Sequence, residues 1–248
     1  MNARSNLISS PVQRANRKQQ KQQIVLRHLR QHVWSSASIL QILLGHQTRQ
    51  ATHTTLTQME SAQLIKRHTY PIPGGNAITL WGITAHGQAM AFEPETELAH
   101  NACFEPTRIS ILNIQHQLDL QLLHIQASQT GWNNWVDGDR LGNLRQGGKR
   151  PDAIATSPAG HITAIECERT IKTTKRYQQI LASYLRAIKA GEFHQVVWIT
   201  PSTELAIRLG SIIKSIETVP IAGQKIAIDP ARHHLHLHFT DYSNWPNL

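Results

Sequence analysis

The sequence has only two cysteines, Cys103 and Cys167, which are too few for the disulfide framework of a small secreted protein. It also lacks any apolar run near the roughly eighteen residues that a membrane span requires. The first residues, MNARSNLISSPVQRANRKQQKQQ, are basic but have no apolar core behind them, so we expect no secretory signal. These absences favour a globular protein in a reducing, cytoplasmic setting.

Acidic residues are scarce at the N-terminal end of the chain. Positions 1–70 hold one acid, Glu60, against ten lysines and arginines, and this segment carries the whole formal net charge of +9. A positive field concentrated at one end favours a polyanionic partner, and nucleic acid is the polyanion that we expect. The other interpretation is a basic tail that only aids solubility.

Apolar periodicity and capping residues predict a small helical domain with a β-hairpin over 1–92. Ser35 or Ser36 can cap one helix and Thr48 can cap the next, because short oxygen-bearing side chains accept hydrogen bonds from the first turn. The expected elements are helices over 17–33, 39–44 and 48–62, strands over 63–70 and 77–83, and a short helix over 84–92. Three helices followed by a two-stranded ribbon predict a winged helix-turn-helix.

The third helix and the ribbon of this domain present side chains suited to double-stranded DNA. Short or basic donors on a helix match the edges of bases in the major groove and the phosphates beside them. The residues expected to bind DNA are Arg49, Gln50, His53, Thr54, Lys66 and Arg67. The alternative is a winged helix that serves only in dimerisation or as a scaffold.

Prolines and glutamates interrupt the pattern at 93–106, which we interpret as a linker to a second domain over 107–248. That domain is expected to be mixed α/β, so that the whole chain is α+β. Its expected elements are helices over 108–129, 172–190 and 203–216, and strands over 151–155, 161–168, 195–200, 224–228 and 234–240.

Three acids gather around the hairpin of the second domain. Glu166 and Glu168 lie two residues apart in a strand, so they share a face, whereas Cys167 points to the other side. Asp152 is on the partner strand, across the turn at 157–160. Converging carboxylates are costly unless a positive charge lies among them, and Mg²⁺ or Mn²⁺ bound through oxygens would supply it.

Basic residues just beyond the strand could complete such a centre. Lys172 and Lys175 are placed to stabilise the charge of a phosphate under attack. The other interpretation is an ordinary strand end with solvated acids, paired with Arg169 or Lys172.

The acid spacing resembles a known nuclease motif. Pro151-Asp152, thirteen further residues and then Glu166-Cys167-Glu168 resemble the PD-(D/E)xK pattern. The segment RPDAIATSPAGHITAIECERTIKTTKRYQQILASYL is similar to the replication-relaxation family of plasmid and mobile-element proteins. Size and domain order resemble the MOBC class of plasmid mobilisation relaxases.

This resemblance implies a winged helix followed by a restriction-endonuclease-like PD-(D/E)xK domain. It implies a metal-dependent single-strand nick in DNA at a plasmid transfer origin, made by hydrolysis with Mg²⁺ or Mn²⁺. The implied partners are a relaxosome accessory protein and a coupling protein.

Carried over by position, the resemblance assigns the metal to Asp152 and Glu166, with the Cys167 carbonyl as a third ligand. Position 168 departs from the pattern, because glutamate stands where the motif has lysine. Glu168 would then orient or deprotonate the attacking water, or Lys172 or Lys175 would take over the role of the lysine.

Two alternatives to a carboxylate nuclease remain open. His234, His236 and His238 alternate near the C-terminus and are expected to share one strand face, as a metal-binding set of a tyrosine nickase would. The candidate nucleophiles for that reaction are Tyr177, Tyr184 and Tyr242. The second alternative is a DNA-binding regulator of plasmid replication or of the relaxosome whose nuclease core is inactive.

Overall fold

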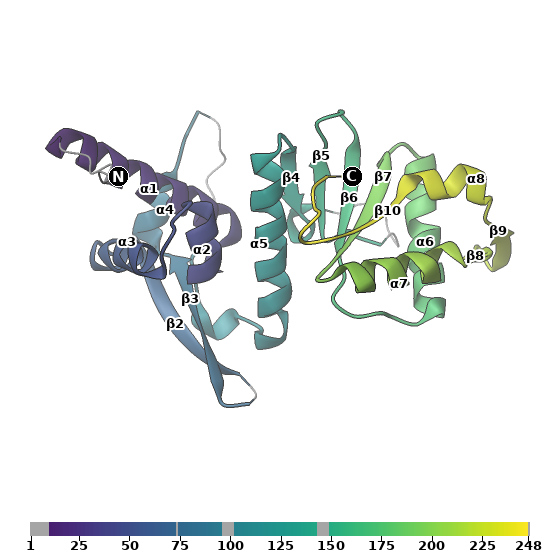
Figure 1. Cartoon of the computed structure of the whole chain (residues 1–248), viewed down its shortest axis with the longest axis horizontal. Coiled ribbons are helices and arrows are strands. Elements are labelled where there is room, and N and C mark those ends of the chain that lie inside the picture. The colour runs from purple at the N-terminus through teal and green to yellow at the C-terminus, as the bar shows by residue number, and fades with distance from the viewer. Residues whose placement is uncertain (1–9, 73, 96–101, 143–148, 248) are drawn as a thin grey trace, which may run out of the picture. The chain divides into compact units, whose positions relative to one another are not determined.

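The computed structural model describes residues 10–72, 74–95, 102–142 and 149–247 and has the α+β composition expected from the sequence. It divides into two compact units, residues 1–121 and 122–248 (Figure 1). Among the described residues, none of the helices combines the length and the apolar character needed to cross a bilayer.

The helices of the first unit begin where the sequence supplies capping side chains. Ser36, Thr48 and Thr84 each accept a hydrogen bond from a backbone N–H of the first turn, as their side-chain chemistry predicts. In chain order the helices are α1 (Pro11–His32), α2 (Ala37–Leu43), α3 (Arg49–Ser61) and α4 (Ala85–Ala91). Their apolar faces enclose a core that includes Val25, Leu29, Leu40, Leu56 and Ile83.

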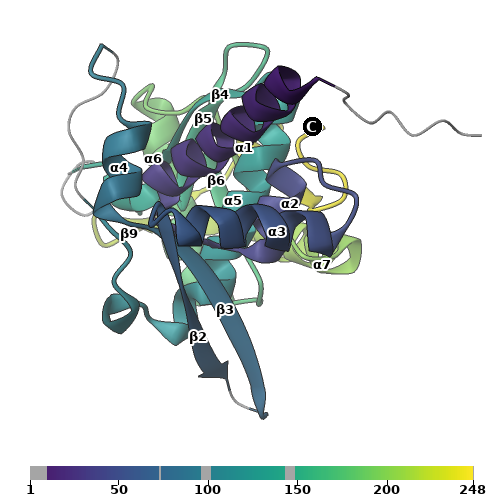
Figure 2. The same ribbon diagram turned by 90° about the vertical axis from the view of Figure 1, so that its left-hand side faces the viewer.

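The hairpin of the first unit belongs to a three-stranded antiparallel sheet. Its strands are β1 (Trp34–Ser36), β2 (Ile65–Ile72) and β3 (Asn76–Ile83), in the spatial order β1-β3-β2. The strand β1 was not predicted. In Figure 2 the β2–β3 ribbon extends beyond α1, α2 and α3.

The predicted linker at 93–106 falls inside the first unit, and its residues 96–101 lie outside the described part of the chain. Phe104 is fully buried, and its N–H donates to the Ile83 carbonyl at 2.9 Å. The N-terminal half of the next long helix, α5 (Ile114–Gln129), also belongs to this unit, because Gln121 Nε2 donates to the Trp34 carbonyl at 2.8 Å. Two short 3₁₀ helices, Pro106–Arg108 and Ile111–Asn113, precede α5. These contacts explain why the division between the units falls within α5 and not before it.

Gly82 allows Phe104 to approach β3 closely. A Cβ atom at position 82 would lie 2.1 Å from Cγ of the Phe104 ring. We therefore expect Gly82→Ala to lower the free energy of unfolding of the first unit by about 1–3 kcal/mol, which hydrogen exchange of β3 amides would measure. In a Phe104→Gly background, which removes both the ring and the Phe104 Cβ that would lie 2.2 Å away, the same substitution is expected to cost much less. Strictly additive effects of the two substitutions would contradict this packing.

The second unit is built on a five-stranded mixed sheet in the order β10-β7-β6-β5-β4. The strands β4, β5 and β6 are antiparallel neighbours, whereas β6, β7 and β10 run parallel. Their bounds are β4 (Asn133–Asp137), β5 (Ala153–Thr156), β6 (Ile162–Cys167), β7 (Gln195–Thr200) and β10 (Leu237–Asp241). A separate hairpin consists of β8 (Thr218–Ile221) and β9 (Gln224–Ala227).

Two long helices pack on one face of this sheet. The helices α6 (Thr174–Lys189) and α7 (Thr203–Lys214) share a buried cluster with Ala164, Val196 and Trp198 of the sheet. Because side chains alternate along β6, Glu166 lies on the same face as Ala164 and therefore toward α6. The remaining short helices of the unit are a 3₁₀ turn at Gly138–Arg140, α8 (Pro230–His233) and a 3₁₀ turn at His234–His236.

The prediction that three alternating histidines share a strand face is wrong. His234 and His236 lie in a 3₁₀ helix, and the strand β10 begins only at Leu237, so that His238 alone is in it. His236 Nδ1 is 2.8 Å from the His194 carbonyl oxygen. The three imidazoles therefore do not form the one-faced set that the tyrosine nickase interpretation required.

Candidate active site

The pairing of β5 with β6 brings Asp152 and Glu166 together. The ladder ends with Ala153 paired to Ile165, and Asp152, one residue before the strand, is close enough for its negative charge to raise the pKa of Glu166. The hairpin predicted from the sequence thus produces the proximity of these two acids.

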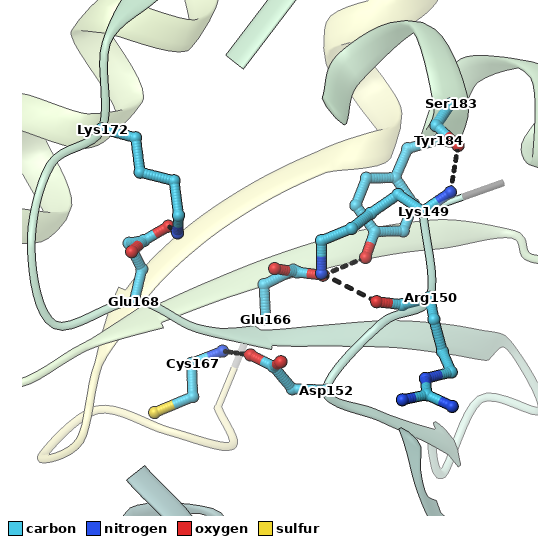
Figure 3. Close-up of polar contacts among 9 residues, drawn as sticks. All are labelled: Lys149, Arg150, Asp152, Glu166, Cys167, Glu168, Lys172, Ser183 and Tyr184. Carbon is cyan, nitrogen blue, oxygen red and sulfur yellow. Dashed lines mark hydrogen bonds and ion pairs between the residues drawn. The ribbon is translucent and has the colours of Figure 1, made fainter. Parts of the chain in front are cut away.

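Asp152 is fixed by contacts with the backbone of β6. Its Oδ2 accepts the Cys167 N–H at 2.9 Å, and its own N–H donates to the Ile165 carbonyl at 3.0 Å (Figure 3). On the other side Gly138 N–H donates to the Asp152 carbonyl at 2.8 Å. A Cβ at Gly138 would lie 2.2 Å from the Pro151 carbonyl oxygen, so this close approach requires glycine.

The Glu166 carboxylate is buried and meets two proton donors. Its Oε1 accepts a hydrogen bond from Lys149 Nζ at 2.6 Å and a second from the Tyr184 hydroxyl (Figure 3). The Glu166 side chain is 4% exposed and that of Lys149 is 23% exposed. Lys149 is held in place by its own N–H, which donates to Ser183 Oγ on α6 at 2.6 Å. Lys149 was not predicted from the sequence as a residue of this site.

Burial governs the proton affinity of Glu166. Burial, with the negative charge of Asp152 as a second cause, raises the pKa of Glu166 to about 7, although Lys149 and the Tyr184 hydroxyl lower it. Burial also raises the pKa of Tyr184 well above its ordinary value, so that its hydroxyl keeps its proton. At neutral pH Glu166 is therefore divided between its acid and carboxylate forms, which suits a group that accepts and returns a proton.

Glu168 belongs to a different pair. Its carboxylate accepts a hydrogen bond from Lys172 Nζ, and Figure 3 shows it turned away from Glu166 toward that lysine. Its backbone N–H donates to the Ile199 carbonyl at 2.9 Å. The expected convergence of three acids is therefore a pair, Asp152 with Glu166, and a separate ion pair. Lys175 is exposed in the first turn of α6.

The donor set has the chemistry of a small magnesium or manganese site. Such ions are bound through one or two carboxylates, with water and phosphate oxygens completing the shell. Asp152 and Glu166 supply two carboxylates, and the Cys167 carbonyl belongs to the same strand end. Within the described part of the chain no group of three or more His, Cys, Asp and Glu side chains is placed to hold a metal. Asp152 and Glu166 are therefore the residues that could hold such an ion, whereas Glu168 is paired with Lys172.

Searches of family models, of curated proteins and of solved structures find no match to this chain.

The tyrosines considered as nucleophiles differ in their surroundings. The Tyr184 side chain is buried against Glu166, and burial raises the pKa of Tyr177 to about 12. The hydroxyl of Tyr242 lies 3.2 Å from Cys167 Sγ. Because Cys167 and Glu166 alternate along β6, Tyr242 contacts the face of the sheet opposite to Glu166.

In the first unit, the residues expected to bind DNA are exposed, and four of them are on α3. Gln50 and Thr54 lie on the helix face opposite to the buried Thr52, Leu56 and Met59. His53 is at the side of that face, and Arg49 is exposed at the first residue of the helix. Lys66 and Arg67 are exposed on β2. The Arg67 guanidinium lies 5.6 Å from the centre of the Trp81 ring and 3.4 Å from a Glu60 oxygen.

A second group of cations flanks α3 and was not singled out from the sequence. The residues Arg14, Arg17, Lys18 and Lys21 of α1 line a pocket of about 220 Å³ together with Thr54, Thr55 and Gln58 of α3. The spacing of three or four residues between these cations places them on one helix face and could have revealed them.

Proposed function

We propose that this chain is a metal-dependent DNA nickase that acts as a plasmid mobilisation relaxase of the MOBC type. In this proposal the first unit is a winged helix that docks on duplex DNA, and the second is a PD-(D/E)xK nuclease core that hydrolyses one strand. The observation that carries the proposal is the trio of Asp152, Glu166 and Lys149 at one strand end. The trio consists of two carboxylates and one lysine, as in the motif. The motif has its lysine at the position of Glu168, whereas in this chain Lys149 contacts Glu166.

The three side chains suit hydrolysis of a phosphodiester. Water attacks phosphorus as the P–O bond to the leaving oxygen breaks, so that water loses one proton and the leaving oxygen gains one from solvent. Lys149 touches Glu166 and is also partly exposed, so its ammonium group can stabilise charge on the phosphate. A bound Mg²⁺ or Mn²⁺ held by Asp152 and Glu166 would polarise the phosphate and acidify water.

The basic surface of the first unit supports the docking part of the proposal. Exposed donors on α3 and four cations of α1 border the same pocket, whose lining includes no acid. Cations arranged this way neutralise backbone phosphates, whereas donors on α3 meet base edges. A transfer origin is the DNA site that the family resemblance implies, with a relaxosome accessory protein and a coupling protein as partners.

The test is conversion of supercoiled plasmid carrying a transfer origin to the open circle. We expect nicking with Mg²⁺ or Mn²⁺ and its loss when EDTA removes the metal, with DNA binding retained in EDTA. Equal nicking with and without metal would refute the metal-dependent reaction. If no nicking were found under any condition, the remaining hypothesis would be a DNA-binding regulator.

A tyrosine reaction is expected to be absent. We expect Tyr242→Phe to nick plasmid at the wild-type rate, within about twofold, because its hydroxyl contacts Cys167 on the far face of β6. Denaturing gels that detect a protein–DNA adduct provide the measurement. An adduct in the wild type that disappears in Tyr242→Phe would replace hydrolysis with a covalent phosphotyrosine mechanism.

The second candidate function, a DNA-binding regulator of plasmid replication or of the relaxosome with an inactive core, is favoured by one observation. Lys149 and Lys172 already supply positive charge to Glu166 and Glu168, so these acids are tolerated without a cation. Under this alternative the pairs are structural, and the plasmid assay shows binding alone.

A further inference from the structure

A strongly basic pocket lies beside Glu166. It has a volume of about 600 Å³ and includes Lys149, the residue that contacts the Glu166 carboxylate. Four of its lining residues are cations and none is acidic; the cations are Lys149, Arg150, Arg176 and Arg186.

The walls of the pocket are formed by α6 and by the segment leading into β5. Arg176, Gln179, Ser183 and Arg186 recur every three or four residues, so they form one stripe along α6. The hydrogen bond from Lys149 N–H to Ser183 Oγ, 2.6 Å long, joins the two walls. The cations are therefore held by folded backbone on both sides.

The two arginines of the pocket that lie on α6 have neutral partners. Arg176 Nη1 donates to Gln179 Oε1 at 3.3 Å, and Arg186 Nε donates to the Ala182 carbonyl at 3.2 Å. Neither contact offsets a positive charge. Gathering like charges in a concave surface raises its potential and attracts an anionic ligand.

The length of the stripe indicates a polymer. Arg176 and Arg186 are ten residues apart on a helix, which corresponds to about 15 Å at 1.5 Å per residue. A single phosphate cannot contact both ends, whereas successive phosphates of a strand, about 3.4 Å apart along a helix axis, can.

We infer that this pocket binds the backbone phosphates of a DNA strand next to the bond that is cut. The inference deepens the proposed function, on which it rests for the identity of the polymer. Lys149 then connects the two sites, because it lines the pocket and contacts Glu166.

Hydrogen exchange of the full-length protein with a short single-stranded DNA oligonucleotide, in EDTA, tests the inference. We expect DNA to slow exchange in α6 of the wild type, and this protection to disappear in Arg176→Gln/Arg186→Gln. The salt dependence of binding is expected to become shallower by about 1.4 in the double variant, since each contact with a single strand contributes about 0.7 to the slope. The single variants should each give half of this change, which keeps the test valid if the double variant does not fold.

The matched control is Arg208→Gln/Arg232→Gln, which removes the same charge from exposed positions of the same unit. The inference would be overturned if DNA did not slow the exchange of α6 in the wild type. It would also be overturned if the control variant lost as much protection as Arg176→Gln/Arg186→Gln. If inorganic phosphate protected α6 as strongly as the oligonucleotide does, the ligand of the pocket would be a small anion and not a DNA strand. Because EDTA prevents metal-dependent cutting, the result does not depend on whether the protein is a nickase.

Discussion

Asp152→Asn is expected to reduce plasmid nicking by at least ~100-fold while leaving DNA binding within about twofold of the wild type. Removing a group that merely orients a metal ligand already costs 10- to 100-fold, and Asp152 is proposed as a ligand itself. Asparagine retains an oxygen that can accept the Cys167 N–H, so the hairpin is expected to fold normally. Initial rates on supercoiled plasmid and a separate binding assay would measure the two effects.

Asp229→Asn is the matched control for this variant. Asp229 caps α8 through a hydrogen bond from Ala231 N–H, a role that asparagine also performs. We expect wild-type nicking from it. Nicking by Asp152→Asn at the rate of the control would remove Asp152 from the mechanism and leave its contact with Cys167 as a structural one.

The stability of the second unit is expected to depend on the protonation of Glu166. The pKa of Glu166 is about 7 in the folded protein and has an ordinary value of 4.5. Between these values the folded protein binds more protons than the unfolded chain, so the free energy of unfolding falls as the pH rises through this window. The shift corresponds to about 3 kcal/mol, fully lost above pH 7.

Glu166→Gln removes this titration. We expect the free energy of unfolding of the wild type, relative to this variant, to fall by about 3 kcal/mol between pH 4.5 and 7.5. Hydrogen exchange of β6 and β7 amides reports on the second unit directly, after correction for the intrinsic pH dependence of exchange. The control is Glu217→Gln, which neutralises an exposed glutamate. The difference in free energy of unfolding between the wild type and this control should not change with pH. If the difference in free energy of unfolding between the wild type and Glu166→Gln also did not change with pH, Glu166 would ionise as readily in the folded protein as in the unfolded chain.

Elements that depend on local chemistry were predictable from the sequence. Ser36, Thr48 and Thr84 cap helices because an N-cap needs only an oxygen beside the first turn. The strand β7 was predicted with its observed bounds, because a short apolar run between turn residues is typical of a buried strand.

Elements that depend on distant partners were not predictable. β1 is three residues long and is a strand because Trp34 pairs with Gly82 of β3, far along the chain. The C-terminal histidines alternate as a strand would, yet the pairing of β10 with β7 begins only at Leu237, and the preceding residues form a 3₁₀ turn. Periodicity over so few residues cannot decide where pairing starts.

The candidate site divides in the same way. The proximity of Asp152 and Glu166 follows from a hairpin whose turn is visible in the sequence. Lys149 could not be found this way, because its contact with Glu166 is made from outside the strands and is anchored by Ser183 on α6. The separation of Glu168 from Glu166 also needed the structure, since residues two apart share a face but their side chains turned to different lysines.

Titration of the wild type and of Asp152→Asn with Mn²⁺ in a calorimeter tests most directly whether this strand end is a metal centre. We expect one saturable heat of binding in the wild type, the same heat in Asp229→Asn, and none in Asp152→Asn. Identical heats in the wild type and Asp152→Asn, or no heat in any of the proteins, would contradict the account.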